Sequence, residues 1–182
     1  MSKLYYFAYG SNLHPVRLQK RVPTANFLGL ITVPGYRLCF HKRHHDDNSG
    51  KCNMFLTNQS CDVVHGALFE MNQDEKPLLD ECEGVGYRCD TLQLQLKDAS
   101  YQSFIYIAED SHIDDSLTPH RWYREIVLLG AEHHDLPSDY VDRIRKIAAA
   151  KDPDARRHDV NSQLIEEMRA FTSNSTNKKS RK

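Results

Sequence analysis

One stretch near the N-terminus decides how this chain is interpreted, Tyr5-Tyr6-Phe7-Ala8-Tyr9-Gly10-Ser11-Asn12-Leu13. Its aromatic-rich first half is typical of a buried strand. The Gly-Ser-Asn that follows predicts a tight turn, with Gly10 in a backbone conformation open only to glycine, and residues 15–20 then predict a helix. Backbone N–H groups left unpaired at a helix start bind anions or oxyanions. The alternative is an ordinary strand-to-helix turn, because glycine, serine and asparagine are common turn residues.

A second distinctive stretch is acidic, Leu78-Leu79-Asp80-Glu81-Cys82-Glu83-Gly84-Val85. Residues 74–82 are predicted as a short helix because apolar residues recur at helical spacing, and Gly84 is placed to end it. Acidic residues at a helix C-terminus are mildly disfavoured by the helix dipole. The stretch is therefore either a plain acidic helix end or one in which a carboxylate has a function.

A third segment begins at Tyr123 and continues through Leu129-Gly130-Ala131-Glu132 to Leu136-Pro137. Taken in order, the three segments resemble the γ-glutamylcyclotransferase family over roughly residues 3–145. The resemblance implies release of 5-oxoproline from a γ-glutamyl amide, in which the α-amine of the substrate attacks its own γ-carbonyl. It also implies a small-molecule substrate, no metal or organic cofactor, a place in glutathione metabolism and a homodimer as one form of assembly.

The same resemblance assigns roles to individual residues. Glu83 would be the general base, because it directly precedes Gly84 as the catalytic glutamate of the family does. The substrate-binding residues would be Tyr9, Gly10, Ser11, Asn12, Leu13 and Tyr123. On residue type alone, Glu83 could belong to an acidic helix end and Tyr123 to the core. The chain departs from the vertebrate-type pattern after Val85, where Gly86-Tyr87-Arg88 follows at once. This shortened loop leaves the leaving group of the substrate open.

Composition limits the other function classes. With 182 residues and 40% hydrophobic content, the chain can form one domain with a real core, which we expect over residues 1–172. The net charge of −1 gives no field that would recruit nucleic acid or an anionic membrane, and no apolar run is long enough to span a bilayer. Five cysteines without a Cys-x-x-Cys pair favour reduced thiols and a cytoplasmic protein.

The order of the predicted elements indicates the fold class. Strand patterns dominate the first two thirds of the chain and helix patterns the last third, which predicts an α+β domain. The helices are expected from Thr118, from Pro137 and over residues 161–171, with residues 152–157 as a linker. We expect a small mixed β-barrel-like sheet flanked by helices, in which the closure of the barrel is implied by the resemblance. The Ser, Asn, Thr and Lys of residues 173–182 predict a disordered basic tail.

Other reactive residue types are interpreted as structural. The segments His44-His45-Asp46-Asp47 and His133-His134-Asp135 lack the spacing of metal ligands and are expected to be solvated. Cys82 has no partner pattern for a nucleophile and is expected to be a small buried residue. Ser11 lacks the Gly-x-Ser-x-Gly elbow of serine hydrolases.

Two other functions remain open beside the cyclotransferase. One is a non-catalytic small-molecule or protein-binding module on the same fold, and the other is a hydrolase of a related amide. The presence of Glu83 together with the Tyr9–Asn12 turn favours an enzyme, because a binding module has no need for a buried base.

Overall fold

The computed structural model describes residues 2–179, and the side chains of residues 2–174. The strands are β1 (Lys3–Ala8), β2 (Asn26–Pro34), β3 (Tyr36–Arg43), β4 (Gly50–Leu56), β5 (Val63–Asn72), β6 (Tyr87–Leu96) and β7 (Ala99–Ala108). The helices are α1 (Pro15–Arg21), α2 (Lys76–Glu83), α3 (Arg121–His133), α4 (Ser138–Lys146) and α5 (Ala155–Lys179), with 3₁₀ turns η1 (Gln73–Glu75) and η2 (Asp110–His112). The α+β class and the mixed sheet flanked by helices are confirmed.

The main sheet has the strand order β2-β5-β1-β7-β6, and β3 and β4 form a separate two-stranded sheet. Strand β1 pairs antiparallel with β5 and parallel with β7, which makes the sheet mixed. The expected barrel closure is wrong, since β2 and β6 are opposite edges of an open sheet. A register shift between Phe27 and Gly29 bends β2, and the side chain of Leu96 packs against Gly29. The two edges therefore approach through side chains, while their backbones stay unpaired in the described residues.

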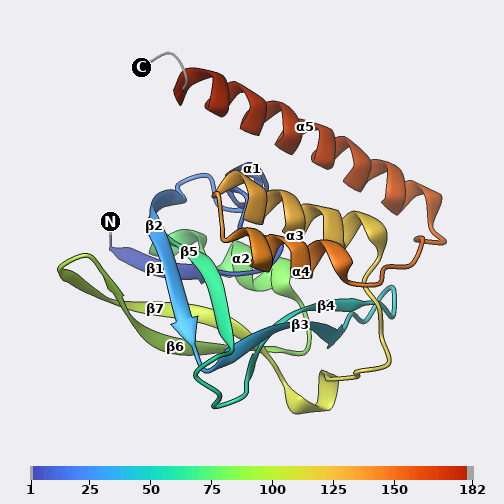
Figure 1. The fold of residues 1–182 in the computed structure, drawn as a ribbon, viewed down its shortest axis with the longest axis horizontal. Coiled ribbons are helices and arrows are strands. Elements are labelled where there is room, and N and C mark those ends of the chain that lie inside the picture. Colours follow the sequence, from blue (N-terminus) through green and yellow to red (C-terminus); the bar gives the residue numbers. More distant parts are fainter. Residues whose placement is uncertain (1, 180–182) are drawn as a thin grey trace.

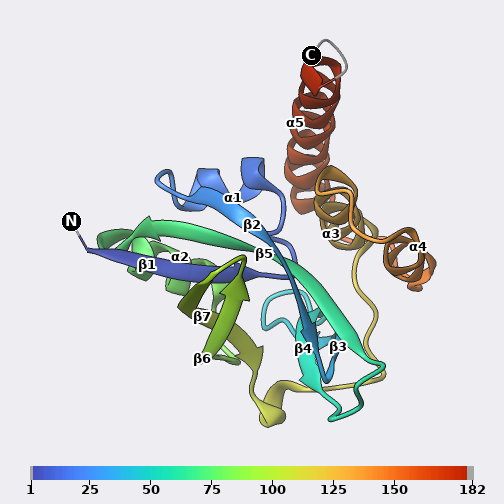
Figure 2. The same ribbon diagram turned by 60° about the vertical axis from the view of Figure 1, so that its left-hand side comes forward.

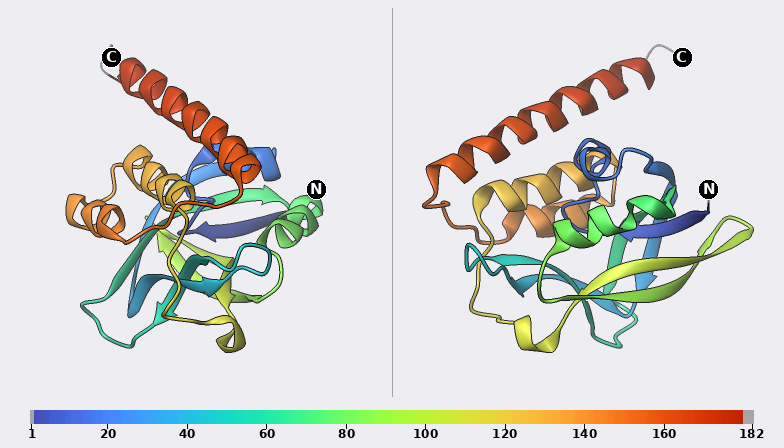
Figure 3. Two further views of the ribbon diagram at one scale, coloured as in Figure 1. Left: turned by 90° about the vertical axis from the view of Figure 1, so that its right-hand side faces the viewer. Right: turned by 180° about the vertical axis from the view of Figure 1, so that it is seen from behind.

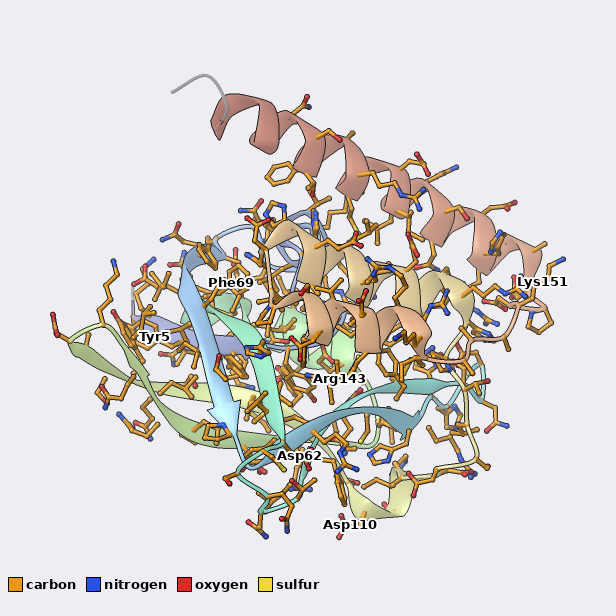
Figure 4. The ribbon with its side chains drawn as sticks, viewed as in Figure 1. Tyr5, Asp62, Phe69, Asp110, Arg143 and Lys151 are labelled. Atoms are coloured by element: carbon orange, nitrogen blue, oxygen red, sulfur yellow. The ribbon has the colours of Figure 1, made fainter. Side chains whose placement is uncertain are left out.

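The helices gather mainly on one side of the main sheet (Figure 1). Helix α5 is the outermost layer and lies over α3, and it projects well away from the sheet when the molecule is turned (Figure 2). Helix α2 lies on the opposite face, as the view from behind shows (Figure 3). Phe69 of β5 points toward the end of α3, where its ring contacts His134 (Figure 4). None of the described helices combines the length and apolar character needed to cross a membrane.

The last helix differs from the sequence expectation at both ends. It begins at Ala155, because the Asp154 carboxylate accepts a hydrogen bond from the N–H of Arg157 and so caps the first turn. The expected linker over residues 152–157 is therefore too long. Helix α5 also continues to Lys179, so residues 173–179 of the expected tail are helical, and residues 180–182 lie outside the described part of the chain.

Two stretches of the first half also differ from expectation. Strand β2 is not largely buried: as an edge strand it leaves Phe27 and Leu30 about two-fifths exposed. The polar segment His41 to Gly50 is only partly a loop, because β3 extends to Arg43 and β4 begins at Gly50. This hairpin lies beside the candidate site and brings polar side chains to it.

Candidate active site

The Tyr9–Asn12 turn follows directly from the end of β1 and leads into α1. Its hydrogen bond runs from the N–H of Leu13 to the carbonyl of Gly10, at 3.0 Å. The expected left-handed backbone at Gly10 is wrong, since the positive-φ glycines are Gly35, Gly84 and Gly86. Glycine is needed here for close approach, because an added Cβ would lie 2.9 Å from Cys52 Cβ. Within the described residues, the N–H groups of Ser11 and Asn12 donate to no other residue.

Glu83 is the last residue of α2. The helix ends at Gly84, whose φ of 69° is favourable only for glycine. This ending directs the Glu83 side chain inward, where it is 15% exposed, whereas Glu81 of the same turn is exposed. Of the acidic residues at this helix end, Glu83 is thus the one placed beside the turn.

A hydrogen-bonded network joins Glu83 to the turn and to α1. The amide Nδ2 of Asn12 donates to Glu83 Oε1 at 2.6 Å and to the Tyr6 hydroxyl oxygen at 3.1 Å. Arg21 Nη1 donates to Asn12 Oδ1 at 2.9 Å and lies 3.3 Å from Glu83 Oε1. The carboxylate therefore has a fixed position and a cationic partner, as a charged group in a part-buried place requires.

A small cavity of ≈ 20 Å³ lies against this network. Its wall consists of the turn, Glu83, the Cys52 side chain and tyrosines 6, 9, 87, 106 and 123. Burial raises the pKa values of Tyr9, Tyr87 and Tyr123 well above the ordinary value for tyrosine. These three phenols therefore stay protonated at neutral pH. Burial also raises the pKa of the Cys52 thiol to about 12. The cavity therefore offers hydroxyl hydrogen bonds and one carboxylate, and its cysteine is not a thiolate nucleophile.

Backbone contacts hold the tyrosine rings in place. Tyr9 donates its hydroxyl to the carbonyl of Tyr106 at 2.6 Å, and Tyr87 donates to the carbonyl of Cys52 at 2.5 Å. The Tyr123 oxygen accepts from the N–H of Cys52 at 3.1 Å. The Tyr6 oxygen accepts from Asn12, and its proton goes to no acceptor among the described residues. Tyr6 is thus a free donor directly beside Glu83.

A wider outer chamber of ≈ 260 Å³ adjoins the cavity and shares Ser11, Glu83, Tyr87 and Tyr123 with it. Its other walls come from α1, the β3–β4 hairpin, α2, α3 and the first turns of α5, namely Arg17, Arg21, His44, Asp47, Lys51, Cys82, Trp122, Arg157 and Asn161. Larger hollows of ≈ 420 Å³ and ≈ 580 Å³ exist elsewhere. The first is lined by Asp62 and Arg143, labelled in Figure 4, and neither hollow includes Glu83 or the turn.

Most of the residues expected at the site from the sequence lie together. Tyr9, Gly10, Ser11, Asn12, Glu83 and Tyr123 all line the inner cavity. Leu13 is the exception: its side chain is 1% exposed and packs on Gly130, and its carbonyl accepts from His134. Leu13 therefore anchors the turn to α3 and does not line the cavity.

Several lining residues were missed by the sequence analysis. Tyr6 is part of the quoted aromatic run, and its place two residues before the end of β1 was the available signal. The others come from distant strands or from helices α1 and α5, namely Arg17, Arg21, Lys51, Cys52, Tyr87, Tyr106 and Arg157. No local pattern in the sequence distinguishes these residues from ordinary strand and helix surface positions.

Two structural interpretations need correction. Cys82 is exposed at the edge of the outer chamber, not buried. Asp47 is not solvated: its side chain is 1% exposed and accepts from Lys51 Nζ at 2.8 Å. Burial alone would raise the pKa of Asp47, but hydrogen bonds from His44 and Lys51 hold it well below its usual range. His133 and His134 also pack against other groups, near Thr172 and the Leu13 carbonyl respectively.

The amino-acid sequence is similar to one family model and to proteins of known name. Residues 63–144 match the model of the AIG2-like family. The chain is 28% identical over 148 residues to a human protein named gamma-glutamylcyclotransferase, covering 78% of this chain and 77% of the relative. It is 27% identical over 152 residues to the mouse protein of that name, with the same coverage.

Solved structures agree with the fold. A structure named gamma-glutamyl cyclotransferase superposes with a TM-score of 0.74 at 22% identity, covering 89% of this chain and 99% of the other. A human protein described as uncharacterized superposes with a TM-score of 0.73 at 24% identity and the same coverage. At these identities the structural likeness shows the fold.

Proposed function

We propose that this chain, which is similar to proteins named gamma-glutamylcyclotransferase, cleaves γ-glutamyl amides and releases 5-oxoproline together with a free amine or amino acid. The observation that carries the proposal is the 2.6 Å hydrogen bond between Asn12 and Glu83. It joins the turn that resembles the substrate-binding segment of the family to a part-buried carboxylate in one cavity. The proposal needs no cofactor, because the nucleophile is part of the substrate.

Glu83 is the proposed general base. In this reaction the α-ammonium of the substrate gives its proton to the carboxylate, and the resulting amine attacks the γ-carbonyl to close a five-membered ring. The proton then passes from Glu83 to the departing nitrogen as the amide bond breaks. Proton transfer by a positioned side chain contributes about 10²- to 10⁴-fold to such a rate.

The turn and the tyrosines are proposed to bind the glutamyl group. The free N–H groups of Ser11 and Asn12 would donate to the oxyanion that develops on the γ-carbonyl, and one such donor contributes about 3–4 kcal/mol. The protonated hydroxyls of Tyr6 and Tyr123 would orient the rest of the group. Holding the chain bent is a further large term, since intramolecular attack in a fixed geometry saves about 7–11 kcal/mol.

Substrate entry requires a local rearrangement. A cavity of ≈ 20 Å³ has room for about one water. We propose that the ammonium of the substrate replaces Asn12 and Arg21 as partner of Glu83, and that their side chains move toward the outer chamber. The charge on Glu83 is then never left unpaired, which would be costly in this part-buried place.

The compartment is proposed to be the cytoplasm. All five cysteines are free thiols, and Cys61, Cys82 and Cys89 are exposed. Exposed free thiols persist in a reducing compartment and oxidise outside it.

Mass spectrometry of the products tests the proposed reaction. The purified chain is incubated with a set of γ-glutamyl amino acids and γ-glutamyl amines, and the products are identified. The account predicts 5-oxoproline with the matching amine or amino acid. Glutamate in place of 5-oxoproline would indicate an amide hydrolase, and unchanged substrates throughout would indicate a binding module.

A further inference from the structure

A lysine of strand β3 is buried beside the candidate active site. Only 1% of Lys42 is exposed, and its side chain is one of the largest that are fully buried. From Cys39 to Lys42, β3 advances three residues while its partner β4 advances two, from Asn53 to Lys51. Such a bulge re-aims the side chains next to it, and three successive residues ending at Lys42 are buried as a result. The bulge therefore turns Lys42 inward.

The Lys42 ammonium contacts the segment that follows the end of α2. Its Nζ donates to the carbonyl oxygen of Val85 at 2.6 Å and lies 4.5 Å from the centre of the Tyr87 ring. A cation over an aromatic face is attracted to the ring. Val85 follows Glu83 by two residues, and Tyr87 lines both the inner cavity and the outer chamber. One side chain from a distant strand thus holds both the loop after Glu83 and a ring of the cavity wall.

The charge of Lys42 has no close acidic partner. Among the described residues, none gives its Nζ a carboxylate at ion-pair distance. Burial lowers the pKa of the ammonium, and the Glu83 carboxylate is the charge that most opposes this shift. A buried cation is costly to a fold, and an apolar residue of similar size often replaces one without loss of stability. Stability alone therefore does not account for a lysine at this position.

The loop that Lys42 contacts has little else to hold it. Its glycines, Gly84 and Gly86, have positive φ angles of 69° and 89°, and the side chain between them, Val85, is 67% exposed. In the described part of the chain, two carbonyls hold this loop to distant segments. The Gly86 carbonyl accepts from the N–H of Glu109 at 2.9 Å, and the Val85 carbonyl accepts from Lys42. The Lys42 contact is the one closer to the end of α2.

We propose that Lys42 is a positioning residue for Glu83. The proposal rests on the proposed cyclotransferase activity, in which the substrate ammonium displaces the partners that Glu83 has on the turn and on α1. Lys42 lines neither the inner cavity nor the outer chamber, so it stays in place at that stage. Its ammonium keeps the Val85 carbonyl and the Tyr87 ring where they are, and its charge continues to face the Glu83 carboxylate. The base therefore keeps its direction while its other contacts change.

The substitution Lys42→Met tests this assignment. Methionine has a flexible, unbranched side chain that fills the same space without the charge or the donor. A displacement of about 1 Å at a catalytic group can cost about 100-fold in rate. We expect kcat for 5-oxoproline release to fall by about 10- to 100-fold, while KM stays within about threefold because Lys42 does not contact the substrate. A melting curve checks that the variant folds, and Lys42→Gln takes its place if it does not.

Three further variants separate positioning from a general structural role. Lys42→Arg keeps a cation and should retain more of kcat than Lys42→Met. Lys3→Met removes an exposed strand lysine that pairs with Glu70, and it should leave kcat unchanged. Lys42→Met combined with Gly84→Ala should lose less than the product of the two single losses, because both act through the same loop. Losses that multiply, or full kcat in Lys42→Met beside an active wild type, would overturn the proposal.

Failure of the cyclotransferase activity itself gives a different result, because the wild type then releases no 5-oxoproline. Hydrogen–deuterium exchange judges Lys42 in that case. Lys42→Met should exchange the amides at the end of α2 and the start of β6 about tenfold faster or more, since a hydrogen bond from a charged donor is lost between them. The amides of α3 should be unaffected. Unchanged exchange on both sides of the loop would overturn the role of Lys42 in holding it.

Discussion

Asn12 is the residue on which the geometry of the site depends most. Its side-chain amide donates to Glu83 and to Tyr6, and its oxygen accepts from Arg21. Three elements, β1, α2 and α1, are thereby connected through one side chain that is 3% exposed. Because both ends of the amide are used, even the isosteric replacement by aspartate would lose two donated hydrogen bonds and place a second carboxylate next to Glu83.

His14, two residues further on, makes stability depend on pH. It is fully buried, its Nδ1 accepts from the N–H of Val16, and its Nε2 lies 3.1 Å from Thr172 Oγ1. Burial, together with the nearby His133 and His134, lowers the pKa of His14 to about 3. The unfolded chain, with a pKa near 6.5, binds more protons between about pH 3 and 6.5. The stabilisation is therefore complete above that window and is lost as the pH falls through it.

We predict that the free energy of unfolding falls by about 1–2 kcal/mol between pH 7 and pH 5 because of this one group. The variant His14→Asn keeps a helix-capping side chain but cannot titrate. Its unfolding free energy, measured by urea denaturation at both pH values, should fall by that much less. His133 and His134 are present in both proteins, so the comparison removes what they contribute independently of His14. Identical pH slopes for the two proteins would contradict the buried neutral histidine.

How far the sequence predicts single residues depends on whether they lie in a local pattern. The Tyr9–Asn12 turn, Glu83 and Tyr123 were identified from ordered segments of the chain and come together as expected. Tyr87 and Arg17 could not be identified in this way. Each belongs to an ordinary amphipathic element, and it is the packing of distant elements that brings the side chain to the cavity.

At the scale of elements, the end of α2 is what gives Glu83 its direction. Gly84 has a φ of 69° and nothing within 4 Å of an added Cβ, so alanine there would be strained but not crowded. Gly35, in the turn between β2 and β3, has a φ of 82° and equally open surroundings. The two glycines form a matched pair, one beside the proposed base and one far from it in the chain.

We predict that Gly84→Ala and Gly35→Ala each destabilise the protein by about 1–3 kcal/mol, measured as the free energy of unfolding. Only Gly84→Ala should also reduce turnover, by roughly tenfold or more, since small displacements of a catalytic group are costly. A Gly84→Ala protein with full turnover would show that Glu83 keeps its position without this helix ending.

Helices and strands with a clear hydrophobic periodicity were predicted well from the sequence. The residues at which they begin and end were predicted less well. The pairing of β6 with β7 and the buried face of α3 match the sequence pattern. The start of α5 was missed, although Asp154 before Ala155 is a recognisable capping residue. Its continuation through the polar residues after Thr172 follows from a helix already begun and packed on α3, a tertiary effect that composition does not contain.

At the scale of the whole molecule, the described contacts of the last part of α5 with other elements are made by Phe171 and Thr172. Thr172 is near both His14 and His133, and Phe171 contacts their rings. Beyond it, Ser173 hydrogen-bonds within its own helix to the carbonyl of Arg169. The functional domain is therefore still expected to be complete at residue 172.

We predict that a chain ending at Thr172 keeps its melting temperature within about 2 °C and its turnover unchanged, since the Ser, Asn, Thr and Lys of residues 173–182 offer little apolar surface to bury. Differential scanning calorimetry and the product assay measure the two quantities. A chain ending at Arg169 is the informative comparison, because it loses the Phe171 and Thr172 contacts and should melt lower. A large loss already in the chain ending at Thr172 would mean that the last residues stabilise the domain or a partner contact.

The fold class was predictable because it follows from the order of strand and helix patterns along the chain. The closure of the sheet into a barrel was not predictable, because closure depends on how the two edge strands meet. In this chain β2 has a bulge beside Gly29 and Leu96 of β6 packs against that glycine, so the edges meet through side chains. This is a local steric outcome that neither periodicity nor a family resemblance specifies.

The substitution Glu83→Gln tests the central claim, that this carboxylate is the base of a cyclotransferase. It keeps the shape and an acceptor oxygen for Asn12 and removes the group that takes the ammonium proton. The account predicts that kcat for 5-oxoproline release falls by at least about a hundredfold. Glu81→Gln, the exposed acid of the same turn, should leave kcat unchanged. A Glu83→Gln enzyme that releases 5-oxoproline at nearly the wild-type rate would contradict the assignment of the base and the mechanism built on it.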